Sequence, residues 1–455
     1  MKKRPRASLL RISSLSLVLL LTSLLEGHEP RFQPNNFTRK VTPSHTPDRI
    51  VLTWSGDPAS SQSVTWRTDS SIPESFAELT IAADHANGLD PSTWTADTQF
   101  LLTDQGGAHY HTVSFTSLNP GTTYAYRVGQ GEDWSEWFHF KTAHDHPEQF
   151  SFIYFGDAQN DIKNHWSRVA REAFRDGPRA AFVLHVGDLV NHGNRDAEWN
   201  EWMEAPGWFN ATIPIVATPG NHEYHPAGID PFGPRKRPPG STGAVLSPHW
   251  RAQFEFPKQS PTPETEETCY YLDIQGIRLI VLDSNIQREE QLAWLEKKLE
   301  SNTQNWTILA FHHPLFSHNE ERDKPNFREL WKPVIDRYKV DLVLTGHDHT
   351  YTRTGEINNV KSDSTGRRGL HQAYDPDIGT VYVVSVSGPK NYGLGNKPRS
   401  FAKRAATEAQ LYQIVTVDSE QLTLEARTAT GALFDSFTLQ KRAGRPNLLI
   451  ENKPE

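Results

Sequence analysis

Five apolar segments that each end in an aspartate, an asparagine or a histidine constrain this 455-residue chain more than any other feature. Continuous apolar runs are typical of strands buried on both faces of a sheet. Amphipathic stretches at about 162–176, 288–300 and 326–338 predict intervening helices. This alternation predicts an α/β domain over residues 150–442. The five segments, each written with the polar motif that follows it, are FSFIYFGD (150–157), AAFVLHVGD (180–188), PIVATPGNHE (214–223), WTILAFHHP (306–314) and VDLVLTGHDH (340–349).

The residues that end these segments are of types that bind metal ions. In open α/β sheets the carboxyl ends of the strands converge on one ligand crevice, so these side chains are expected to meet. Imidazole, carboxylate and amide groups without a thiolate suit Zn, Mn or Fe. The set exceeds the needs of one tetrahedral ion and indicates two divalent ions that share a bridging carboxylate. The candidates are Asp157, Asp188, Asn221, His222, His312, His313, His347 and His349.

The charges at such a centre favour an anionic substrate. Two divalent ions would contribute +4, two aspartates −2 and a hydroxide −1, for a net charge of about +1. This charge attracts a phosphate dianion, which the carboxylates alone would repel. The α/β domain contains no Gly-x-Ser-x-Gly sequence, so serine hydrolase chemistry is not indicated.

Residues 44–143 follow a different pattern. Seven short alternating segments, without helical spacing, predict a β-sandwich. The stretch LNPGTTYAYRVG (118–129) resembles the later strands of fibronectin type III modules. No cluster of titratable residues is evident here, so a structural or docking module is expected. The segments are 48–54, 62–68, 77–83, 99–103, 111–118, 123–130 and 137–142.

The first 27 residues have the pattern of a secretory signal peptide. Basic residues precede an apolar run from Ile12 to Leu25 that is short for a membrane span. An uncleaved N-terminal anchor is the alternative, because no clean small-x-small triplet precedes His28. A secreted, periplasmic or cell-envelope protein is therefore expected. Its single cysteine, Cys269, cannot close an internal disulfide. Residues 443–455 are expected to form a C-terminal tail.

The overall charge argues against nucleic acid as a partner. Lys plus Arg number 47 against 55 Asp plus Glu, which gives a net charge of −8 at pH 7. This balance offers no basic face for a polyphosphate backbone. An apolar fraction of 36% and a charged fraction of 22% suit a globular protein and not a multi-span membrane protein.

The ordered motifs resemble those of the metallophosphoesterase superfamily. Preceded by a fibronectin-like module, they are most similar to the purple acid phosphatases and their bacterial relatives. The resemblance implies an α/β domain of two mixed β-sheets flanked by helices. The motifs are GD (156–157), GDLVNHG (187–193), GNHE (220–223), FHHP (311–314) and GHDH (346–349).

The resemblance also implies a role for each residue. The first metal would be held by Asp157, Asp188 and His349, and the second by Asp188, Asn221, His312 and His347. His222 would lie beside the substrate as the catalytic residue that stabilises the phosphoryl group or protonates the leaving oxygen. Asn221 and His318 would also contact substrate, although a surface position is an equal alternative for His318. Glu223 and Asp348 are expected to orient their neighbours.

Two positions depart from the family pattern. Purple acid phosphatases have a tyrosine where this chain has Asn191, and other members have a histidine where it has Gln159. Either residue could supply an amide oxygen to the first metal. Because a phenolate is missing from the Asn191 position, we expect a colourless enzyme with two divalent ions.

The predicted function is hydrolysis of a small-molecule phosphate monoester by a hydroxide that two metal ions activate. A phosphodiesterase or nucleotidase on the same centre is one alternative. Another is a cell-surface binding protein whose metal site has decayed. The sequence leaves the metal identity, the physiological substrate and the oligomeric state open.

Overall fold

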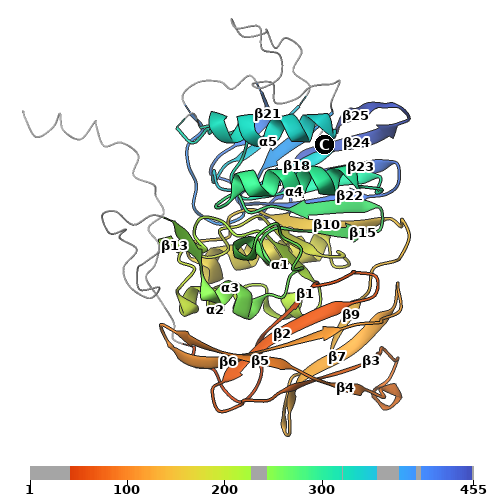
Figure 1. The fold of residues 1–455 in the computed structure, drawn as a ribbon, viewed down its shortest axis with the longest axis vertical. Coiled ribbons are helices and arrows are strands. Elements are labelled where there is room, and N and C mark those ends of the chain that lie inside the picture. The colour runs from red at the N-terminus through yellow and green to blue at the C-terminus, as the bar shows by residue number, and fades with distance from the viewer. Residues whose placement is uncertain (1–40, 227–242, 320, 356–378, 396–400, 453–455) are drawn as a thin grey trace, which may run out of the picture. The chain divides into compact units, whose positions relative to one another are not determined.

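The computed structural model describes residues 41–226, 243–319, 321–355, 379–395 and 401–452. The predicted signal peptide lies outside these residues. Within them, no helix is both long enough and apolar enough to cross a membrane. Figure 1 shows the two predicted parts, a β-sandwich that begins the described chain and an α/β domain that follows.

The α/β domain contains two mixed β-sheets, as predicted. The larger one joins parallel strands β10, β11 and β12 to antiparallel strands β22–β25. In the other, β16, β17, β18 and β20 are parallel, and β15, β19 and β21 are antiparallel to their neighbours. The bounds in the larger sheet are β10 (Phe150–Phe155), β11 (Val183–His185), β12 (Ile215–Ala217), β22 (Leu411–Val417), β23 (Gln421–Thr428), β24 (Leu433–Arg442) and β25 (Arg445–Asn452). In the other they are β15 (Tyr270–Ile274), β16 (Ile277–Val281), β17 (Trp306–Ala310), β18 (Leu342–Thr345), β19 (Tyr351–Thr354), β20 (Val381–Val384) and β21 (Ala402–Ala406).

The two sheets pack face to face and helices cover their outer faces. Along β17, Ile308 and Ala310 join a core shared with β10–β12, whereas Leu309 packs with residues of α4 and α5. This alternation follows from the two-residue period of a strand. Figure 1 shows α4 and α5 side by side. The helices are η2 (Ile162–Trp166, a π-helical turn), α1 (Ser167–Asp176), α2 (Asp196–Glu204), η3 (Gly207–Ala211), α3 (Pro248–Gln253), η4 (Pro263–Thr265), α4 (Arg288–Glu300) and α5 (Pro325–Arg337).

The helix ends follow local sequence signals. Gly177 ends α1, where its N–H bonds the Ala173 carbonyl. Pro325 begins α5, a position where proline's missing N–H costs nothing. A short hairpin of β13 (Tyr224–Pro226) and β14 (Ala244–Leu246) flanks the segment that the structure does not describe.

The first domain is a two-sheet sandwich whose core contains Trp66, Phe115 and Tyr126. One of its sheets does not end at the domain boundary. Strand β1 pairs in parallel with β12 of the α/β domain, with Thr53 opposite Ile215. The described chain therefore carries an eleven-stranded sheet that runs through both domains. The sandwich elements are β1 (Asp48–Thr53), β2 (Gln62–Asp69), β5 (Asp97–Thr103) and β6 (Gly106–Phe115) in this sheet, with β3 (Phe76–Ile81), β4 (Ser92–Thr95), β7 (Thr123–Gln130), β8 (Asp133–Trp134) and β9 (Phe138–Lys141) in the other and η1 (Ala86–Gly88) between β3 and β4.

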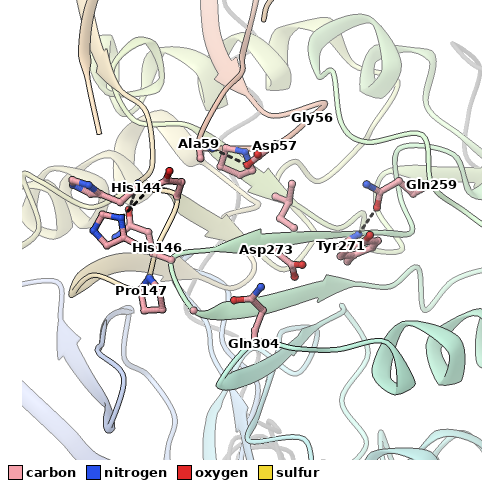
Figure 2. A pocket seen from close by; sticks show the side chains of 15 residues that line it. Gly56, Asp57, Ala59, His144, His146, Pro147, Gln259, Tyr271, Asp273 and Gln304 are labelled. Atoms are coloured by element: carbon pink, nitrogen blue, oxygen red, sulfur yellow. Dashed lines mark hydrogen bonds and ion pairs between the residues drawn. The ribbon is translucent and has the colours of Figure 1, made fainter. Parts of the chain in front are cut away.

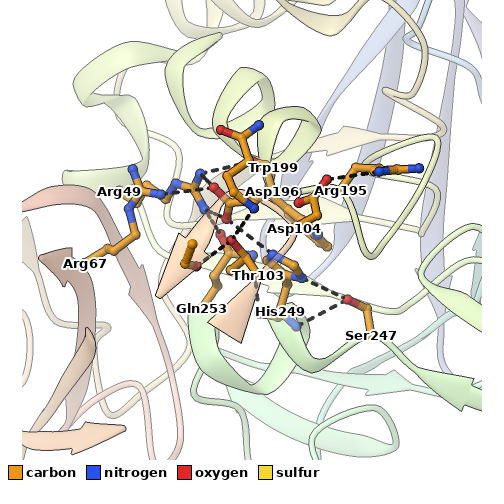
Figure 3. Close-up of polar contacts among 12 residues, drawn as sticks. Arg49, Arg67, Thr103, Asp104, Arg195, Asp196, Trp199, Ser247, His249 and Gln253 are labelled. Atoms are coloured by element: carbon orange, nitrogen blue, oxygen red, sulfur yellow. Dashed lines mark hydrogen bonds and ion pairs between the residues drawn. The ribbon is translucent and has the colours of Figure 1, made fainter. Parts of the chain in front are cut away.

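A buried ion-pair network joins the same two domains (Figure 3). Arg49 of β1 donates from both terminal nitrogens to the Asp196 carboxylate of α2, each at 2.8 Å. Arg67 of β2 donates to the same carboxylate at 3.2 Å and to Asp48 at 2.6 Å. His249 of α3 lies 3.3 Å from Asp196 on another side. The sandwich is therefore tied to the α/β domain by strand pairing and by charge.

The prediction that residues 443–455 form a C-terminal tail is wrong for the described part of that segment. Residues Arg445–Asn452 form β25, which pairs antiparallel with β24 through Leu439 and Leu449. Leu449 is buried in the main core. The sheet therefore extends past residue 442, because an alternating segment beside an open strand edge gains both hydrogen bonds and apolar burial.

Candidate metal centre

The predicted ligands follow the carboxyl ends of strands from both sheets. Asp157, Asp188 and Asn221 come shortly after β10, β11 and β12, and His312 and His347 come shortly after β17 and β18. The two sheets meet directly at this point, because the His347 N–H donates to Asp157 Oδ2 at 2.6 Å. Strand ends far apart in the sequence thus share one site, as the sequence predicted.

The residues predicted for the second metal gather around one nitrogen of His312. Its Nε2 lies 3.2 Å from Asn221 Oδ1, 3.1 Å from His347 Nδ1 and 3.3 Å from Asp188 Oδ2. These four atoms come from four different loops. Such a convergence of nitrogen and oxygen donors is the arrangement that a divalent ion requires.

The residues predicted for the first metal lie beside this group. His349 Nε2 lies 3.8 Å from Asp157 Oδ1, a buried oxygen that has no hydrogen-bond partner among the described residues. Ligand atoms of Asp157, Asp188 and His312 all lie within 4.8 Å of one another. Asp188 therefore belongs to both groups, which fits the bridging role expected of it.

Hydrogen bonds outside the centre select the nitrogen that two of the histidines, His312 and His349, turn inward. His312 Nδ1 donates to the Val186 carbonyl at 2.9 Å, and His349 Nδ1 donates to the Lys390 carbonyl at 3.0 Å. Each Nε2 is thereby left as the ligand atom. The donor set and the unpartnered Asp157 oxygen both fit two divalent ions, with Asp157, Asp188, Asn221, His312, His347 and His349 as ligands.

The electrostatics of the cluster are those of acids and bases forced together in a buried site. Burial raises the pKa of Asp157 well above its usual range, and Asp188 raises it further. Burial also raises the pKa of Asp188, but His312 and His222 outweigh this effect and hold it well below its usual range. Burial lowers the pKa of His312, yet Asp188 raises it to about 9. Cations would relieve the repulsion between the two carboxylates.

Four of the predicted ligands have left-handed backbone conformations, which are uncommon for residues with a side chain. The φ angles are 40° for Asp157, 51° for Asp188, 74° for His347 and 50° for His349. Strain of this kind persists where the surroundings over-determine it, typically at functional sites. Gly346 shows how crowded the loops are, because an added Cβ would lie 2.4 Å from Asp157 Oδ2.

Glu223 and Asp348 orient these loops, as expected from the sequence. The Glu223 carboxylate accepts hydrogen bonds from the N–H groups of Asp188 at 2.9 Å and Gly220 at 2.7 Å, and from those of the two residues after Asp188. Asp348 accepts from Arg322 Nε at 3.0 Å, and Arg322 also donates to the His347 carbonyl at 2.5 Å. Both carboxylates therefore fix backbone at the ligand positions.

The predicted catalytic residue, His222, lies at the edge of the centre. Its Nδ1 donates to the Asn191 carbonyl at 2.6 Å, and its backbone N–H donates to Asp188 Oδ1 at 2.9 Å. Its Nε2 lies 3.8 Å from Asp188 Oδ2, with 18% of the side chain exposed. One nitrogen is thus fixed by the fold, while the other faces the Asp188 carboxylate.

A separate cavity of about 420 Å³ contains none of the predicted ligands. Figure 2 shows its lining, which includes His144 and His146 of the inter-domain linker, Asp57 of the sandwich and Asp273 of β15. Its carboxylates have local roles, since Asp57 accepts from the Ala59 N–H at 2.9 Å and Asp273 binds Arg278 at 2.8 Å. Among the described residues that line this cavity, no group of side chains is arranged to hold a metal ion.

Comparison with known proteins agrees with the geometry. A calcineurin-like phosphoesterase model matches residues 150–351, and a purple acid phosphatase N-terminal domain model matches residues 47–142. Purple acid phosphatase 18 of Arabidopsis thaliana is 26% identical over 403 residues, covering 86% of this chain and 82% of its own. Acid phosphatase type 7 of Homo sapiens is 26% identical over 376 residues, covering 76% and 78%.

The chain combines a calcineurin-like phosphoesterase domain with a purple acid phosphatase N-terminal domain. A solved structure of a purple acid phosphatase from yellow lupin (Lupinus luteus) seeds has the same fold, with a TM-score of 0.70 at 21% identity, covering 87% of this chain and 74% of its own. The family resemblance and the fold class are thereby confirmed. The chain is a phosphoric ester hydrolase, and its family uses a dinuclear metal centre.

The two departures from the purple acid phosphatase pattern lie differently in the structure. Gln159 is buried between the first-metal ligands, 3.5 Å from His349 Nε2. In the orientation that satisfies both amide atoms, the Gln159 nitrogen donates to Asp188 Oδ2 at 3.0 Å, and its oxygen accepts from Lys390 Nζ at 3.3 Å. The Asn191 amide lies 3.0 Å from His192 Nδ1, and its backbone carbonyl positions His222. Metal ligation by either residue stays a prediction, as does substrate contact by the buried His318.

Sequence reasoning missed several residues around the centre. Lys390 follows β20, a sixth buried strand. The rule that polar residues at strand ends share one site could therefore have identified it from the sequence. Tyr392 places its ring 4.8 Å from that of His349, and the Arg322 guanidinium lies 4.8 Å from the Tyr392 ring. No sequence motif marks Arg322, because its partner Asp348 lies 26 residues away.

Proposed function

We propose that this protein is a secreted phosphomonoesterase that hydrolyses small phosphate esters with two divalent ions. The observation that carries the proposal is the convergence of Asn221, His347 and Asp188 within 3.3 Å of His312 Nε2. A decayed metal site would have no reason to keep these donors aligned or to keep their backbone strained. The secretory pattern of residues 1–27 supports the location.

Each protein group has a task that its contacts suggest. When bound, the two ions would activate a water molecule as the nucleophile and offset charge on the phosphoryl oxygens. Asp188 would hold both positions at a fixed separation, and Glu223 would hold Asp188. His222, with Nδ1 held by Asn191, presents Nε2 as the atom that donates a proton to the leaving oxygen. No side-chain nucleophile is required.

A metal titration with two readouts tests this function. The chelator-treated protein receives Zn, Mn or Fe, and metal content is measured together with hydrolysis of phenyl phosphate. We expect two ions per chain and activity that rises with them, and we expect an Asp188→Asn variant to lose both. A wild-type protein that binds no metal and turns over nothing would instead favour the binding-protein alternative.

Ester preference and metal type need separate measurements. Faster hydrolysis of an aryl phosphate than of a bis-aryl phosphate is expected for a monoesterase, and the reverse would establish the diesterase alternative. The metal-loaded protein is expected to lack an intense visible band. A band that Tyr392→Phe abolishes would show phenolate ligation from a different loop and contradict the divalent–divalent assignment.

A further inference from the structure

A second cavity, of about 410 Å³, adjoins the metal centre. Its lining includes the predicted ligand Asn221 and also His313, whose ring centroid lies 4.3 Å from that of His347. Arg288, the first residue of α4, also lines it, beside Asn285. The volume lies in the range of small-molecule sites, about 300–1,000 Å³. A substrate whose phosphoryl group binds at the metals can extend its leaving group into this cavity.

The Arg288 guanidinium is fixed in place but not neutralised. Its Nε donates to the Ser284 carbonyl at 2.6 Å, and its carbon lies 4.7 Å from the centre of the Phe327 ring. Its two terminal nitrogens make no hydrogen bond or ion pair with any residue that the structure describes. A guanidinium held by one edge and one face presents its remaining donors in a rigid fork that matches a carboxylate or phosphate.

The nearby carboxylates do not supply the missing partner. Asp283 accepts from the Tyr224 hydroxyl and, at 2.9 Å, from the Asn285 N–H, and it forms no ion pair with Arg288. Glu289 is exposed. Burial lowers the pKa of Arg288, and Asp283, which forms no ion pair with it, offsets this effect only in part. An anionic ligand would restore the lost hydrogen bonds and offset that cost.

A second cation stands beside the first. Lys324, which precedes α5, also has no ion pair among the described residues. Phe327, on which the Arg288 guanidinium packs, donates its N–H to the Lys324 carbonyl at 3.1 Å, so both cations lie at the same end of α5. Burial lowers the pKa of Lys324, and Arg288 and Arg322 lower it further. Asp348 raises the pKa of Lys324, but its carboxylate is already hydrogen-bonded to Arg322 at 3.0 Å. Neither Arg288 nor Lys324 has an ion-pair partner among the described residues, so a ligand can bring the anion.

We propose that Arg288 and Lys324 form a subsite for a second anionic group, so that the preferred substrates are phosphate esters whose leaving group carries a carboxylate or a further phosphate. The phosphoryl group that is hydrolysed occupies the metal centre, and the second anion binds the Arg288 fork across the cavity. This inference rests on the proposed function, because the metal centre defines which end of the substrate reacts.

A binding measurement tests the subsite without turnover. Benzylphosphonate and 4-carboxybenzylphosphonate, which are not hydrolysed, are titrated calorimetrically into the metal-loaded protein. We expect the carboxylated compound to bind about tenfold more tightly or better, as for a charged hydrogen bond. Arg288→Gln should reduce this ratio to near one, and Lys324→Gln should lower it in part. The control is Arg337→Gln, which removes a cation of α5 whose side chain is 68% exposed. This variant should leave the affinity ratio unchanged.

Turnover identifies the second anion. The kcat/KM values for 4-carboxyphenyl phosphate and for 1,4-phenylene bisphosphate are each divided by that for phenyl phosphate. Either ratio supports the subsite if it exceeds one in the wild type and falls in Arg288→Gln but not in Arg337→Gln. The compound with the larger ratio carries the preferred anion. Equal ratios in all proteins, with phenyl phosphate turned over, overturn the subsite and leave the proposed function standing. If no ester is hydrolysed, the proposed function fails, and the phosphonate titration decides the subsite by itself.

Discussion

The two nitrogens of His222 have different environments. A change at this residue can therefore test catalysis separately from metal binding. Nδ1 is fixed by the Asn191 carbonyl at 2.6 Å, whereas Nε2 faces Asp188 at 3.8 Å. We expect His222→Asn to lower kcat for phenyl phosphate about 10²–10⁴-fold, the usual effect of removing a general acid. Metal content should not change, since His222 is not a predicted ligand.

The matched control is His146→Asn, which changes a linker histidine whose side chain is 60% exposed. Its kcat should equal that of the wild type. Loss of bound metal in His222→Asn, in parallel with activity, would assign the residue to the metal centre and contradict a role in proton transfer.

The loop after β18 depends on the absence of a side chain at Gly346. An added Cβ would contact Asp157 Oδ2 at 2.4 Å, while that same oxygen accepts from the His347 N–H. We expect Gly346→Ala to displace Asp157 and weaken metal affinity roughly 10–100-fold. A zinc titration against a competing chelator measures this. Gly393→Ala is the control, because nothing lies within 4 Å of its added Cβ. Equal affinity in both variants would refute the steric account.

The connection between η4 and β15 should carry a measurable pH dependence. Burial raises the pKa of Glu267 from 4.5 to about 7, and Glu255 adds to the effect. Between those values the folded protein holds a proton that the unfolded chain releases, so the free energy of unfolding falls as pH rises. Glu267→Gln cannot lose that proton and should be more stable at pH 8 by on the order of 1–3 kcal/mol.

Urea unfolding of wild type and Glu267→Gln at pH 4, 6 and 8 measures this difference, which should vanish at pH 4. The exposed neighbour Glu266 provides the control, because Glu266→Gln removes the same charge without relieving burial. A Glu267→Gln protein that is less stable than wild type at pH 8 would show that the Arg251 and Lys258 ion pairs outweigh burial.

At the scale of the whole molecule, Asp196 links the sandwich to the α/β domain. Its carboxylate is 3% exposed and pairs with both Arg49 and Arg67, whose side chains are 2% and 1% exposed. Removing one partner of such a network leaves buried charges uncompensated. We expect Asp196→Asn to lower the free energy of unfolding by about 3–5 kcal/mol. Glu296→Gln breaks an exposed pair with Arg337 and should cost less than about 1 kcal/mol.

Thermal and urea unfolding measure both variants. If Asp196→Asn costs no more than Glu296→Gln, strand pairing between β1 and β12 alone holds the junction. A second, earlier transition in Asp196→Asn would show that the sandwich separates first, and would agree with the network's role.

Much of the fold could be predicted because strong periodicity reports which faces are buried. The runs before Asp157, Asp188 and His312 are predominantly apolar, and the structure buries them between a second sheet and the helices. The pairing of β1 with β12 could not be predicted. It joins Thr53 to Ile215, and no local pattern encodes which strand becomes the neighbour of another far along the chain.

Local chemistry alone determined which side chains can bind metal in this protein: aspartate, asparagine and histidine follow five of its buried strands. Their meeting, the inward choice of Nε2 on His312 and the unneutralised Arg288 beside them were decided by tertiary structure. The reason is physical. A ligand's identity belongs to its residue, but its direction depends on a carbonyl or carboxylate from a distant loop, such as Val186 for His312 at 2.9 Å.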